Sequence, residues 1–542
     1  MIRSVLVCLA IAMLSLEDRH AFLRAEPSIP VVPGLVGFGV NTPAGSGRHE
    51  NVPDTKVFKV TNLDASGQGS LQECIYASGP RTCVFEVSGV IDLTGDKSYD
   101  GSAVINLKNP YITIAGQTAP SPGITIKGKT LRIEAHDVLI QHLRFRVGDS
   151  TDVSISPDVR DTILIAGSHK SASRTPHNIV IDHCSISWAI DEVVSVKDTS
   201  HHITLSNNII SEGLDRSLHP KGEHSKGLMA VGNYQTIYRN LFAHLRDRAP
   251  LDVSPNSVIV NNLSYNTKYA NIWSLSRSAH YAKKNYSRAL DLVANLRVRG
   301  KNTSDRGQNI YAKASENLSE KTNFYVSGNR CTNHLNTLVE CGVLNGDGLR
   351  REMPLNLDSN MNIWSASKLK EKLLLNVGAR PLDRDEIDRR IVNDVYTDSG
   401  QTPDCVGQGD IAYPVGRLLN VSAMAVSFKL PRCYESRFEG QEIRVVQTNG
   451  DLKTGRITEH KCHLHGVNQL TVSGFATASL SEGLEYRVIN SCSNNAGGWP
   501  DSSMRRRPLE LPPNPNIVSR SGYTRLEEYL HKMAYALEVG HH

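Results

Sequence analysis

The acidic residues around a short apolar strand, in the stretch from Asp182 to Glu192, are the residues best suited to chemistry in this sequence. The stretch reads DHCSISWAIDE and belongs to a series of similar strand-and-turn units. Carboxylates at the strand ends of such a series stack in line with the carboxylates of neighbouring turns. A hard cation such as calcium takes several oxygen ligands in a flexible geometry, so this pattern predicts a calcium site.

The units that must position these acids repeat from about residue 56 to residue 330. Each unit is a short β-branched strand, a polar turn and a further strand, and several copies are 22 to 26 residues apart. The clearest strands are residues 111–114, 138–140, 179–181, 203–205, 236–238 and 258–260. A repeat of this length without helices predicts a solenoid, in which each coil buries its apolar face on the next.

Asparagines recur just after several of these strands, at Asn207-Asn208, Asn240 and Asn261-Asn262. This recurrence is typical of a ladder of stacked amides at a turn. A β-sandwich would also contain short strands, but it would not place asparagine at the same offset from successive strands. We therefore predict an all-β solenoid, a right-handed parallel β-helix with C-terminal capping helices and a small inserted β-domain.

The later part of the chain departs from this repeat. Apolar residues at helical spacing predict helices over 365–377, 383–395 and 524–539, which we expect to cover an end of the solenoid. Residues 402–493 instead alternate like β-strands and contain four cysteines. We predict a β-helical domain over 36–395, an inserted disulfide-bonded β-domain over 402–493 and a tail helix within 494–542. For the insert, a structural or tethering role is favoured over carbohydrate binding.

The N-terminus indicates export. The apolar run from Ser4 to Leu16 follows Arg3 and precedes a polar segment, so residues 1–25 are interpreted as a signal peptide whose cleavage point the sequence does not place. A buried core helix is the alternative. No later run is apolar and long enough to span a bilayer. We therefore expect a secreted, extracellular monomer without a membrane span.

Cysteine usage agrees with an oxidising compartment. Cys74 with Cys83 and Cys331 with Cys341 would close short loops, and Cys184 is predicted to be a buried free thiol. Five glycosylation sequons are present, at Asn262, Asn285, Asn302, Asn317 and Asn420. The net charge of +5 is compatible with an acidic substrate, and its dispersed charges give little support to nucleic-acid binding.

Several segments together resemble one enzyme family. They are FKVTNL at 58–63, VFEVSG at 84–89, IAGQTAP at 114–120, the stretch 182–192, and the tail around 522–530. They resemble the family 1 polysaccharide lyases, the pectate lyases, over residues 36–395 and 494–538. The resemblance implies a secreted lyase with calcium as cofactor and homogalacturonan, an acidic plant cell-wall polysaccharide, as partner. Such an enzyme cleaves polygalacturonate by β-elimination to 4,5-unsaturated oligogalacturonides.

The same resemblance implies the metal ligands. Asp161 and Asp191 match the first and second calcium-binding positions of the family, while Ser195 stands where the family usually has a further Asp. Glu192 would replace the missing acid if its side chain turns toward the site. Asp182 matches a residue that is structural in the family.

The resemblance also implies the residues that act on the substrate. Lys226, in the segment HSKGL, would bind a substrate carboxylate, and Arg248, in DRAPL, would bind the polymer and act as the base. An arginine base requires a lowered pKa, which burial and nearby cations would provide. The simpler alternatives are an exposed turn lysine and an arginine that only binds the polymer. A second arginine of the family falls at Val253 here.

Three other functions remain open from the sequence. A glycoside hydrolase is disfavoured, because it needs a pair of carboxylates and the chain has no Asp-Asp pair. A non-catalytic β-helical protein that binds or adheres to polysaccharide would explain the changes at Ser195 and Val253. A pectin lyase acting on methylated pectin is the third.

Overall fold

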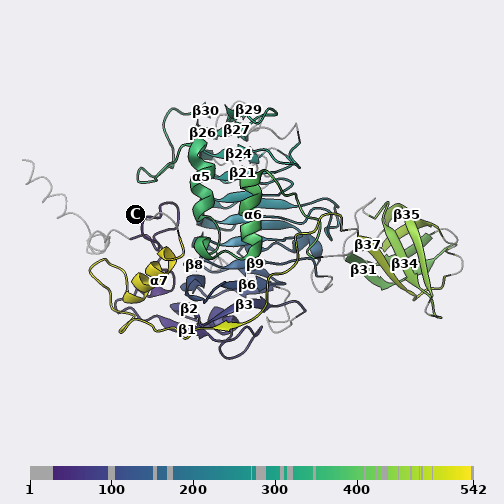
Figure 1. The fold of residues 1–542 in the computed structure, drawn as a ribbon, viewed down its shortest axis with the longest axis horizontal. Helices are drawn as coiled ribbons and strands as arrows, with labels where there is room; N and C mark the ends of the chain where they lie inside the picture. Colours follow the sequence, from purple (N-terminus) through teal and green to yellow (C-terminus); the bar gives the residue numbers. More distant parts are fainter. Residues whose placement is uncertain are drawn as a thin grey trace, which may run out of the picture.

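The computed structural model contains a stack of coils, each of which adds one strand to each of three long sheets (Figure 1). The structure describes residues 29–95, 104–150, 156–167, 175–269, 271–275, 288–304, 310–313, 322–345, 349–407, 411–422, 425–429, 438–449, 451–463, 467–474, 477, 480–490 and 492–538. Strands from successive coils pair in parallel, apart from short antiparallel pairings at the ends of one sheet. The fold is therefore the parallel β-helix that the sequence predicted.

The strands of the three sheets recur in a fixed order along the chain. The first sheet contains β1 (Lys56–Val60), β2 (Arg81–Phe85), β5 (Ile112–Ala115), β8 (Val138–Gln141), β11 (His177–Asp182), β14 (His201–Ser206), β17 (Asn233–Tyr238), β20 (Asn256–Val260), β23 (Arg288–Val293), β26 (Thr322–Ser327) and β30 (Leu349–Arg350). The second contains β38 (Arg505–Arg506), β3 (Val87–Asp92), β6 (Ile124–Lys127), β9 (Arg144–Arg146), β12 (Ser185–Ser187), β15 (Ile209–Ser211), β18 (Leu241–Ala243), β21 (Leu263–Tyr265), β24 (Leu296–Val298), β27 (Arg330–Thr332) and β28 (Leu338–Glu340). The third contains β4 (Val104–Leu107), β7 (Thr130–Ile133), β10 (Ile163–Ile165), β13 (Glu192–Val196), β16 (Lys226–Ala230), β19 (Leu251–Asp252), β22 (Asn271–Leu275), β25 (Ile310–Lys313) and β29 (Val343–Asn345).

Aliphatic side chains at one register position fill the interior of the solenoid. In the first sheet this row consists of Ile114, Ile140, Ile181, Leu205, Ile237, Ile259, Leu292 and Val326, each paired with the next. All of them belong to the main core cluster. Burying one such side chain contributes roughly 1.5–3 kcal/mol to stability, so each coil that adds an aliphatic residue to this row stabilises the solenoid further.

The predicted asparagine ladder is confirmed. The side-chain amide of Asn208 donates to Oδ1 of Asn240, and Asn240 donates in the same way to Asn262, both at 3.0 Å. Two residues that the sequence analysis did not include, Asn295 and Asn329, extend the ladder by two coils with the same 3.0 Å bonds. Each Oδ1 also accepts from a backbone N–H of the preceding coil, so the ladder satisfies polar groups at a turn that is buried.

Two helices cover the outer face of the second sheet. They are α5 (Ala366–Asn376) and α6 (Glu386–Thr397), which run along the stack in Figure 1. The apolar residues that they share with the sheet are Ile209, Leu241, Leu263, Leu296, Leu369, Leu373, Ile387, Ile391 and Val395. The expectation that these helices cap an end is therefore corrected, because the outer face of the second sheet is itself apolar and needs cover.

Buried ion pairs fix α6 against the second sheet. Arg146 donates to Asp385 at 2.7 Å and to Asp388 at 3.0 Å, and Arg144 Nε donates to Asp388 at 2.9 Å. The adjacent arginines hold the pKa of Asp385 well below its usual value, although burial alone would raise it. Removing one partner from such a pair costs about 3–5 kcal/mol, because the remaining charge stays buried.

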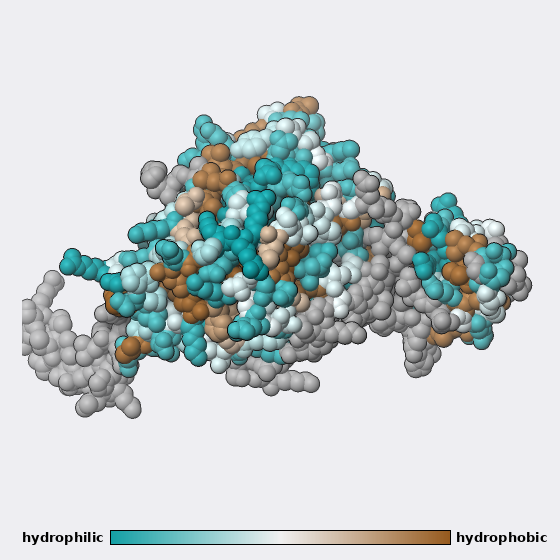
Figure 2. All heavy atoms as spheres, turned by 60° about the horizontal axis from the view of Figure 1, so that its bottom comes forward, coloured by the Kyte–Doolittle hydropathy of each residue, from teal (hydrophilic) through white to brown (hydrophobic). Residues whose placement is uncertain are grey.

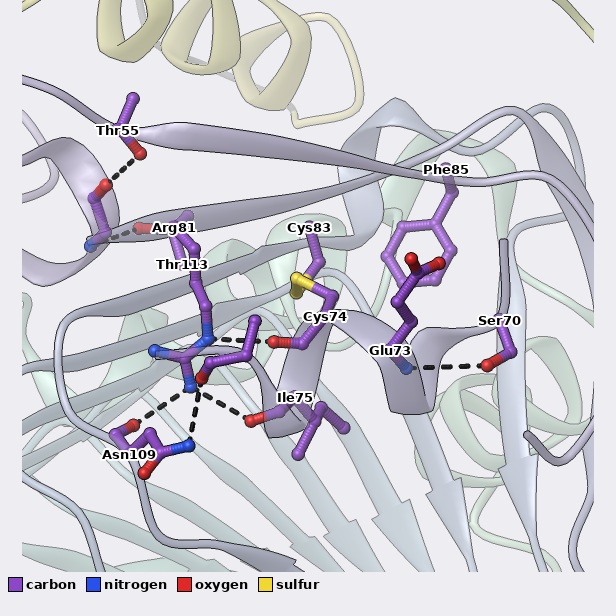
Figure 3. Close-up of a disulfide and its surroundings, with 12 residues drawn as sticks. Thr55, Ser70, Glu73, Cys74, Ile75, Arg81, Cys83, Phe85, Asn109 and Thr113 are labelled. Atoms are coloured by element: carbon purple, nitrogen blue, oxygen red, sulfur yellow. Dashed lines mark hydrogen bonds between the residues drawn. A yellow bond between two sulfur atoms is a disulfide. The ribbon is translucent and has the colours of Figure 1, made fainter. Parts of the chain in front are cut away.

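A helix that the sequence analysis did not predict covers the N-terminal end of the solenoid. The short helix α3 (Leu71–Tyr76) buries Leu71, Cys74 and Ile75 in the interior core. A disulfide joins Cys74 to Cys83 of β2, and the buried guanidinium of Arg81 donates to the backbone oxygens of Cys74 and Ile75 (Figure 3). The tail helix α7 (Arg525–Tyr535), also expected to cap an end, instead packs Leu526 and Leu530 on the outer side of the first sheet.

Residues 411–490 contribute a fourth, antiparallel sheet that lies apart from the stack in Figure 1. Its strands are β31 (Ile411–Arg417), β32 (Asn420–Val421), β33 (Ala425–Lys429), β34 (Glu442–Val446), β35 (Leu452–His463), β36 (Val467–Ser473) and β37 (Glu485–Asn490). It has a separate apolar core that includes Val426, Ile443, Leu470 and Val488. A disulfide between Cys405 and Cys492 joins the two chain segments that lead into and out of the sheet.

The cysteine predictions agree with the structure. Cys331 bonds Cys341, as Cys74 bonds Cys83, and Cys184 is a buried free thiol. The signal-peptide prediction concerns residues outside the described part of the chain. Figure 2 shows a face on which hydrophobic patches are separated by hydrophilic residues. Within the described residues, no helix is both long and apolar enough to cross a bilayer.

One glycosylation sequon is inaccessible in the folded chain. Asn262 is 2% exposed, and its amide nitrogen donates within the asparagine ladder. The sequence pattern carries no information on burial, so the prediction at Asn262 is wrong for the folded protein. Asn302 is half-buried and Asn420 is exposed, while Asn285 and Asn317 fall outside the described residues.

Candidate active site

The predicted site residues lie at the beginnings of successive strands of the third sheet. Asp161 precedes β10, Glu192 begins β13, Lys226 begins β16 and Arg248 precedes β19. Glu192 and Lys226 are paired in register. Because neighbouring strands are about 4.8 Å apart, residues far apart in sequence come side by side along the sheet edge.

Three carboxylates form the centre of this edge. Asp161, Asp191 and Glu192 each place one oxygen within 4.8 Å of the others. Asp161 and Glu192 are buried, and Asp191 is half-buried. Glu192 turns toward the cluster, since its backbone N–H donates to Asp161 Oδ1 at 3.2 Å and its carboxylate receives the Ser195 hydroxyl at 3.3 Å. The orientation of Glu192, which the sequence left open, is thereby resolved.

The carboxylates differ in their electrostatic environments. Burial, reinforced by the charge of Asp191, raises the pKa of Asp161 to about 7. Burial acts in the same direction on Asp191, but the hydrogen bond and charge of His224 outweigh it and lower the pKa of Asp191. A buried acid with a raised pKa thus lies beside an ionised acid. A cation bound between them would stabilise the negative charge of both.

Ser195 occupies the position between two of these acids. Its hydroxyl lies 3.0 Å from Asp161 Oδ1 and 3.3 Å from Glu192 Oε2. The hydroxyl has one proton and can donate to only one of the two oxygens at a time. Ser195 therefore adds a neutral oxygen to the cluster where an aspartate would add a charge.

The oxygen cluster fits a hard divalent cation. All three side chains offer carboxylate oxygens, the ligands that calcium prefers, and the serine hydroxyl adds a further oxygen donor. Burial and the charge of Asp191 raise the pKa of Asp161, so a bound cation would favour the ionised form of this acid. Asp161, Asp191 and Glu192 are thus the residues that would hold the ion.

Arg248 faces the cluster from the coil of β19. Its Nη1 contacts Glu192 Oε1, and its Nε lies 3.8 Å from Asp247 Oδ1. The side chain of Arg248 is 25% exposed. Burial lowers the pKa of Arg248, and the negative charges of Asp191 and Asp161 only partly offset this effect. Burial thus favours the neutral form of the guanidinium, and the two acids favour its charged form.

Lys226 has a partner that sequence reasoning did not identify. Its ammonium contacts Asp247 Oδ2, and the two residues also form an isolated backbone bridge. Asp247 immediately precedes Arg248 in the segment DRAPL, so it lies beside both cationic residues of the site. The sequence could have pointed to Asp247 only through its position next to the predicted base. An acidic residue in a turn is common, so this position alone is weak evidence for a role in the site.

Two histidines were also missed. His224 Nε2 lies 2.7 Å from Asp191 Oδ1, and His219 Nε2 lies 3.6 Å from the same oxygen. Their rings stack with centroids 3.6 Å apart. His224 lies two residues before Lys226 in the segment HSKGL, but the contact to Asp191 joins different coils and no sequence spacing indicates it. Both rings approach Asp191 through Oδ1, so this oxygen is the one that they hold in place.

Asp182 lies outside this cluster, as the sequence analysis expected. Its two oxygens accept hydrogen bonds from Ser206, Asn207 and Gln141 on neighbouring coils and from the adjacent His183. The position of Val253, half-buried after β19, supplies no charged side chain to the edge. The sheet edge therefore has valine at the position where the related family pattern has its second arginine.

Similarity to known proteins points to pectate lyases. The chain is 32% identical over 244 residues to a probable pectate lyase C of Emericella nidulans, a match that covers 45% of this chain and 49% of that protein. Probable pectate lyase C of Aspergillus terreus is 33% identical over 43% of this chain and 47% of its own. The one of Aspergillus flavus is 28% identical over 58% of this chain and 64% of its own. The resemblance that the sequence motifs suggested is confirmed.

These matches have limited extent. The chain spans about half the length of the first two curated relatives. No protein-family model matches the chain. Among solved structures, the cedar pollen allergen jun a 1 is 16% identical over 64% of this chain and 92% of its own, with a TM-score of 0.44. Pectate lyase Bsp165PelA from Bacillus sp. N165, solved with trigalacturonate, is 15% identical over 64% of this chain and 98% of its own, with a TM-score of 0.40.

Proposed function

We propose that this protein is a pectate lyase, which cleaves polygalacturonate by calcium-assisted β-elimination. The observation that carries the proposal is the placement of Asp161, Asp191 and Glu192 next to Arg248 at one sheet edge. The curated relatives, all named probable pectate lyase C, support the same reaction. The substrate is an acidic polymer, homogalacturonan, and the products are 4,5-unsaturated oligogalacturonides.

The chemistry requires positive charge opposite the uronate carboxylate. Calcium held by the three acids would withdraw charge from that carboxylate and so acidify the neighbouring C5–H bond. Lys226 binds a substrate carboxylate as a point charge, and its contact with Asp247 holds the ammonium at the edge. The attraction of calcium and of Lys226 for the substrate carboxylate grows as negative charge builds up on its oxygens. Because this charge develops in the transition state, both cations would stabilise the transition state more than the bound substrate.

Arg248 is the base in this proposal. It removes the C5 proton, the electrons of that bond form the C4–C5 double bond, and the C4–oxygen bond breaks, with the leaving oxygen protonated from solvent. Burial lowers the pKa of Arg248, which favours this role. Its contact with Glu192 stabilises the charged form, so the ion pair must open before the guanidinium gives up a proton.

We also propose that the protein acts outside the cell. The apolar run near the N-terminus supports this, as do the three disulfides that the described residues contain. Mass measurement of protein recovered from the culture medium tests it. A secreted form shortened by roughly the first 25 residues is the expected result, and protein retained in the cell with an intact N-terminus would contradict it.

The reaction is tested by following ultraviolet absorbance of the unsaturated product. The purified protein is incubated with polygalacturonate in the presence of calcium and, separately, of a chelator. We expect absorbance to rise with calcium and to stop with chelator. A parallel incubation with highly methylated pectin tests substrate charge, because a methyl ester removes the carboxylate that Lys226 would bind.

Other outcomes support the other functions. Absorbance that rises only with methylated pectin and without calcium would identify a pectin lyase. Co-sedimentation with polygalacturonate, without product under any condition, would identify a non-catalytic binding protein. New reducing ends without absorbance would indicate hydrolysis. Each of these results overturns the proposal.

A further inference from the structure

A row of histidines lies on the outside of the first sheet, where its strands begin. His177 begins β11 and pairs in register with His201, which begins β14. His136 occupies the same position one coil earlier, two residues before Val138, which pairs with Ile179. Adjacent rings stack with centroids 4.7 and 4.9 Å apart and planes inclined by 17°. We call His136, His177 and His201 the histidine row.

The hydrogen bonds of His136 and His177 determine which ring nitrogen carries the proton in each. His177 Nδ1 lies 2.7 Å from the backbone oxygen of Thr175, which can only accept, so Nδ1 carries the proton. His136 Nδ1 likewise donates to the Asp137 carboxylate at 2.7 Å. In a neutral imidazole with its proton on Nδ1, Nε2 presents a lone pair. Metal-binding histidines commonly have this pattern, in which the second nitrogen donates to a carboxylate or carbonyl.

The acceptors that hold these rings are themselves fixed. Asp137 accepts from Thr42 at 2.7 Å and from Asn178 at 3.3 Å through the oxygen that His136 does not use. His201 Nδ1 lies 2.7 Å from His202 Nδ1, and one of the two must donate to the other. The three rings of the row are half-buried, so their outer edges face solvent. Among the described residues, none hydrogen-bonds to their Nε2 atoms.

We propose that the histidine row binds a divalent transition-metal ion that prefers imidazole nitrogen, such as Zn²⁺ or Cu²⁺. A zinc–nitrogen bond is about 2.0–2.1 Å, so two imidazoles on one ion have nitrogens at most about 4 Å apart. Adjacent rings of the row need only tilt their outer edges together to reach this separation. Two nitrogens, one of them from His177 and the other from His136 or His201, then bind the ion, and water completes its coordination.

The row differs from the carboxylate cluster in both place and chemistry. The cluster lies at the edge of the third sheet and offers oxygen ligands, which suit calcium. The row lies on the first sheet and offers nitrogen, which suits zinc and copper. The two sites therefore bind different ions, and the proposal does not depend on the lyase activity.

Calorimetric titration tests the site directly. The full chain is saturated with calcium, so that the carboxylate cluster is filled, and is then titrated with Zn²⁺. We expect one strong site in the wild type and a loss of affinity of at least about tenfold in His177→Gln, which removes the central ligand. The matched control is His334→Gln, an exposed histidine in the turn between β27 and β28, and it should bind like the wild type.

Electron paramagnetic resonance of bound Cu²⁺ provides an independent measurement that needs no variant. Nitrogen hyperfine structure from at least two imidazoles is expected, and its loss in His177→Gln would assign it to the row. Affinity lost in His224→Gln but retained in His177→Gln would place the ion beside Asp191 and overturn the proposal. A copper spectrum with only oxygen ligands would also overturn it. Melting of the metal-free variants verifies that they fold.

Discussion

The proposed base illustrates how a single residue depends on its surroundings. Arginine is normally protonated at any physiological pH. Here burial lowers the pKa of Arg248, while Asp161 and Asp191 oppose that effect. A cation held by those acids would reduce their opposition, because its charge screens theirs. The acids and the base are thus coupled, and a change in one should be measurable in the other.

Ser195→Asp should strengthen calcium binding. The aspartate would lie against Asp161 and Glu192 and add a negative charge to the cluster, where affinity depends on ligand charge. The calcium concentration for half-maximal product formation should fall by about tenfold. Ser195→Ala, which removes the hydroxyl without adding charge, is the control and should not lower that concentration. Unchanged or weaker calcium dependence in Ser195→Asp would contradict the assignment of these ligands.

Asp161 should make the metal-free protein less stable as the pH rises. Its folded pKa is about 7, raised first by burial, whereas an aspartate free of such effects has a pKa of 3.8. Between these values the unfolded chain releases this proton while the folded chain keeps it. The contribution of Asp161 to the free energy of unfolding is therefore fully present below about pH 4, and it decreases by a few kcal/mol up to about pH 7.

Chemical unfolding in chelator across this pH range tests that dependence. In Asp161→Asn the position does not titrate, so the variant should lose this part of the pH dependence. Identical slopes in wild type and Asp161→Asn would contradict the raised pKa.

At the scale of elements, the parallel coils are what bring the site together. The repeat of strands and asparagines was visible in the sequence because each coil reuses the same register positions. Asp161, Asp191, Lys226 and Arg248 were instead named from the resemblance of their segments to those of pectate lyases, and the repeat alone did not single them out. The contacts of His219 and Asp247 could not be predicted, because they depend on the path of turns between coils, which the strand pattern does not specify.

Helices were harder to place than strands. The apolar spacing of α5, α6 and α7 predicted that they exist, but not which surface each one covers. The outer face of the second sheet is apolar in register, at Ile209, Leu241 and Leu263, and this decides the position of α5 and α6. The helix α3 is too short for its periodicity to be recognised, so the end that it covers was not foreseen.

Asn240→Ala should destabilise the stack. It removes an amide that donates to Leu205 O and Asn262 Oδ1, and it leaves the side chain and backbone N–H of Asn208 without their acceptor. An unsatisfied buried group costs about 1–3 kcal/mol. Urea unfolding should show a loss of that size, whereas the exposed Asn360→Ala should change stability by less than about 0.5 kcal/mol. Equal effects of the two variants would contradict a stabilising ladder.

At the scale of the whole molecule, the fourth sheet is proposed to be a separable insert, residues 402–493. Its core contains residues of that segment alone, and the disulfide between Cys405 and Cys492 brings its ends to a Cα–Cα separation of 5.8 Å. Its distance from the carboxylate cluster along the chain is large, and no residue of the cluster comes from it.

Replacing residues 408–490 with about three glycines or serines should leave the solenoid folded, because a short linker spans the closed ends. Melting temperature of the solenoid and rate on polygalacturonate should both stay near their wild-type values. Failure of the shortened chain to fold would show that the sheet is an integral part of the solenoid. Loss of activity in a folded product would show that it takes part in the reaction.

The central claim is that the edge of the third sheet carries out β-elimination with Arg248 as the base. The most direct measurement is the rate of unsaturated product formed from polygalacturonate by Arg248→Ala in saturating calcium, with the exposed Arg520→Ala as the control. Loss of a general base predicts a rate about 10²- to 10⁴-fold lower for Arg248→Ala, with the melting temperature and the Arg520→Ala rate little changed. A folded Arg248→Ala protein that works at the wild-type rate would contradict the claim.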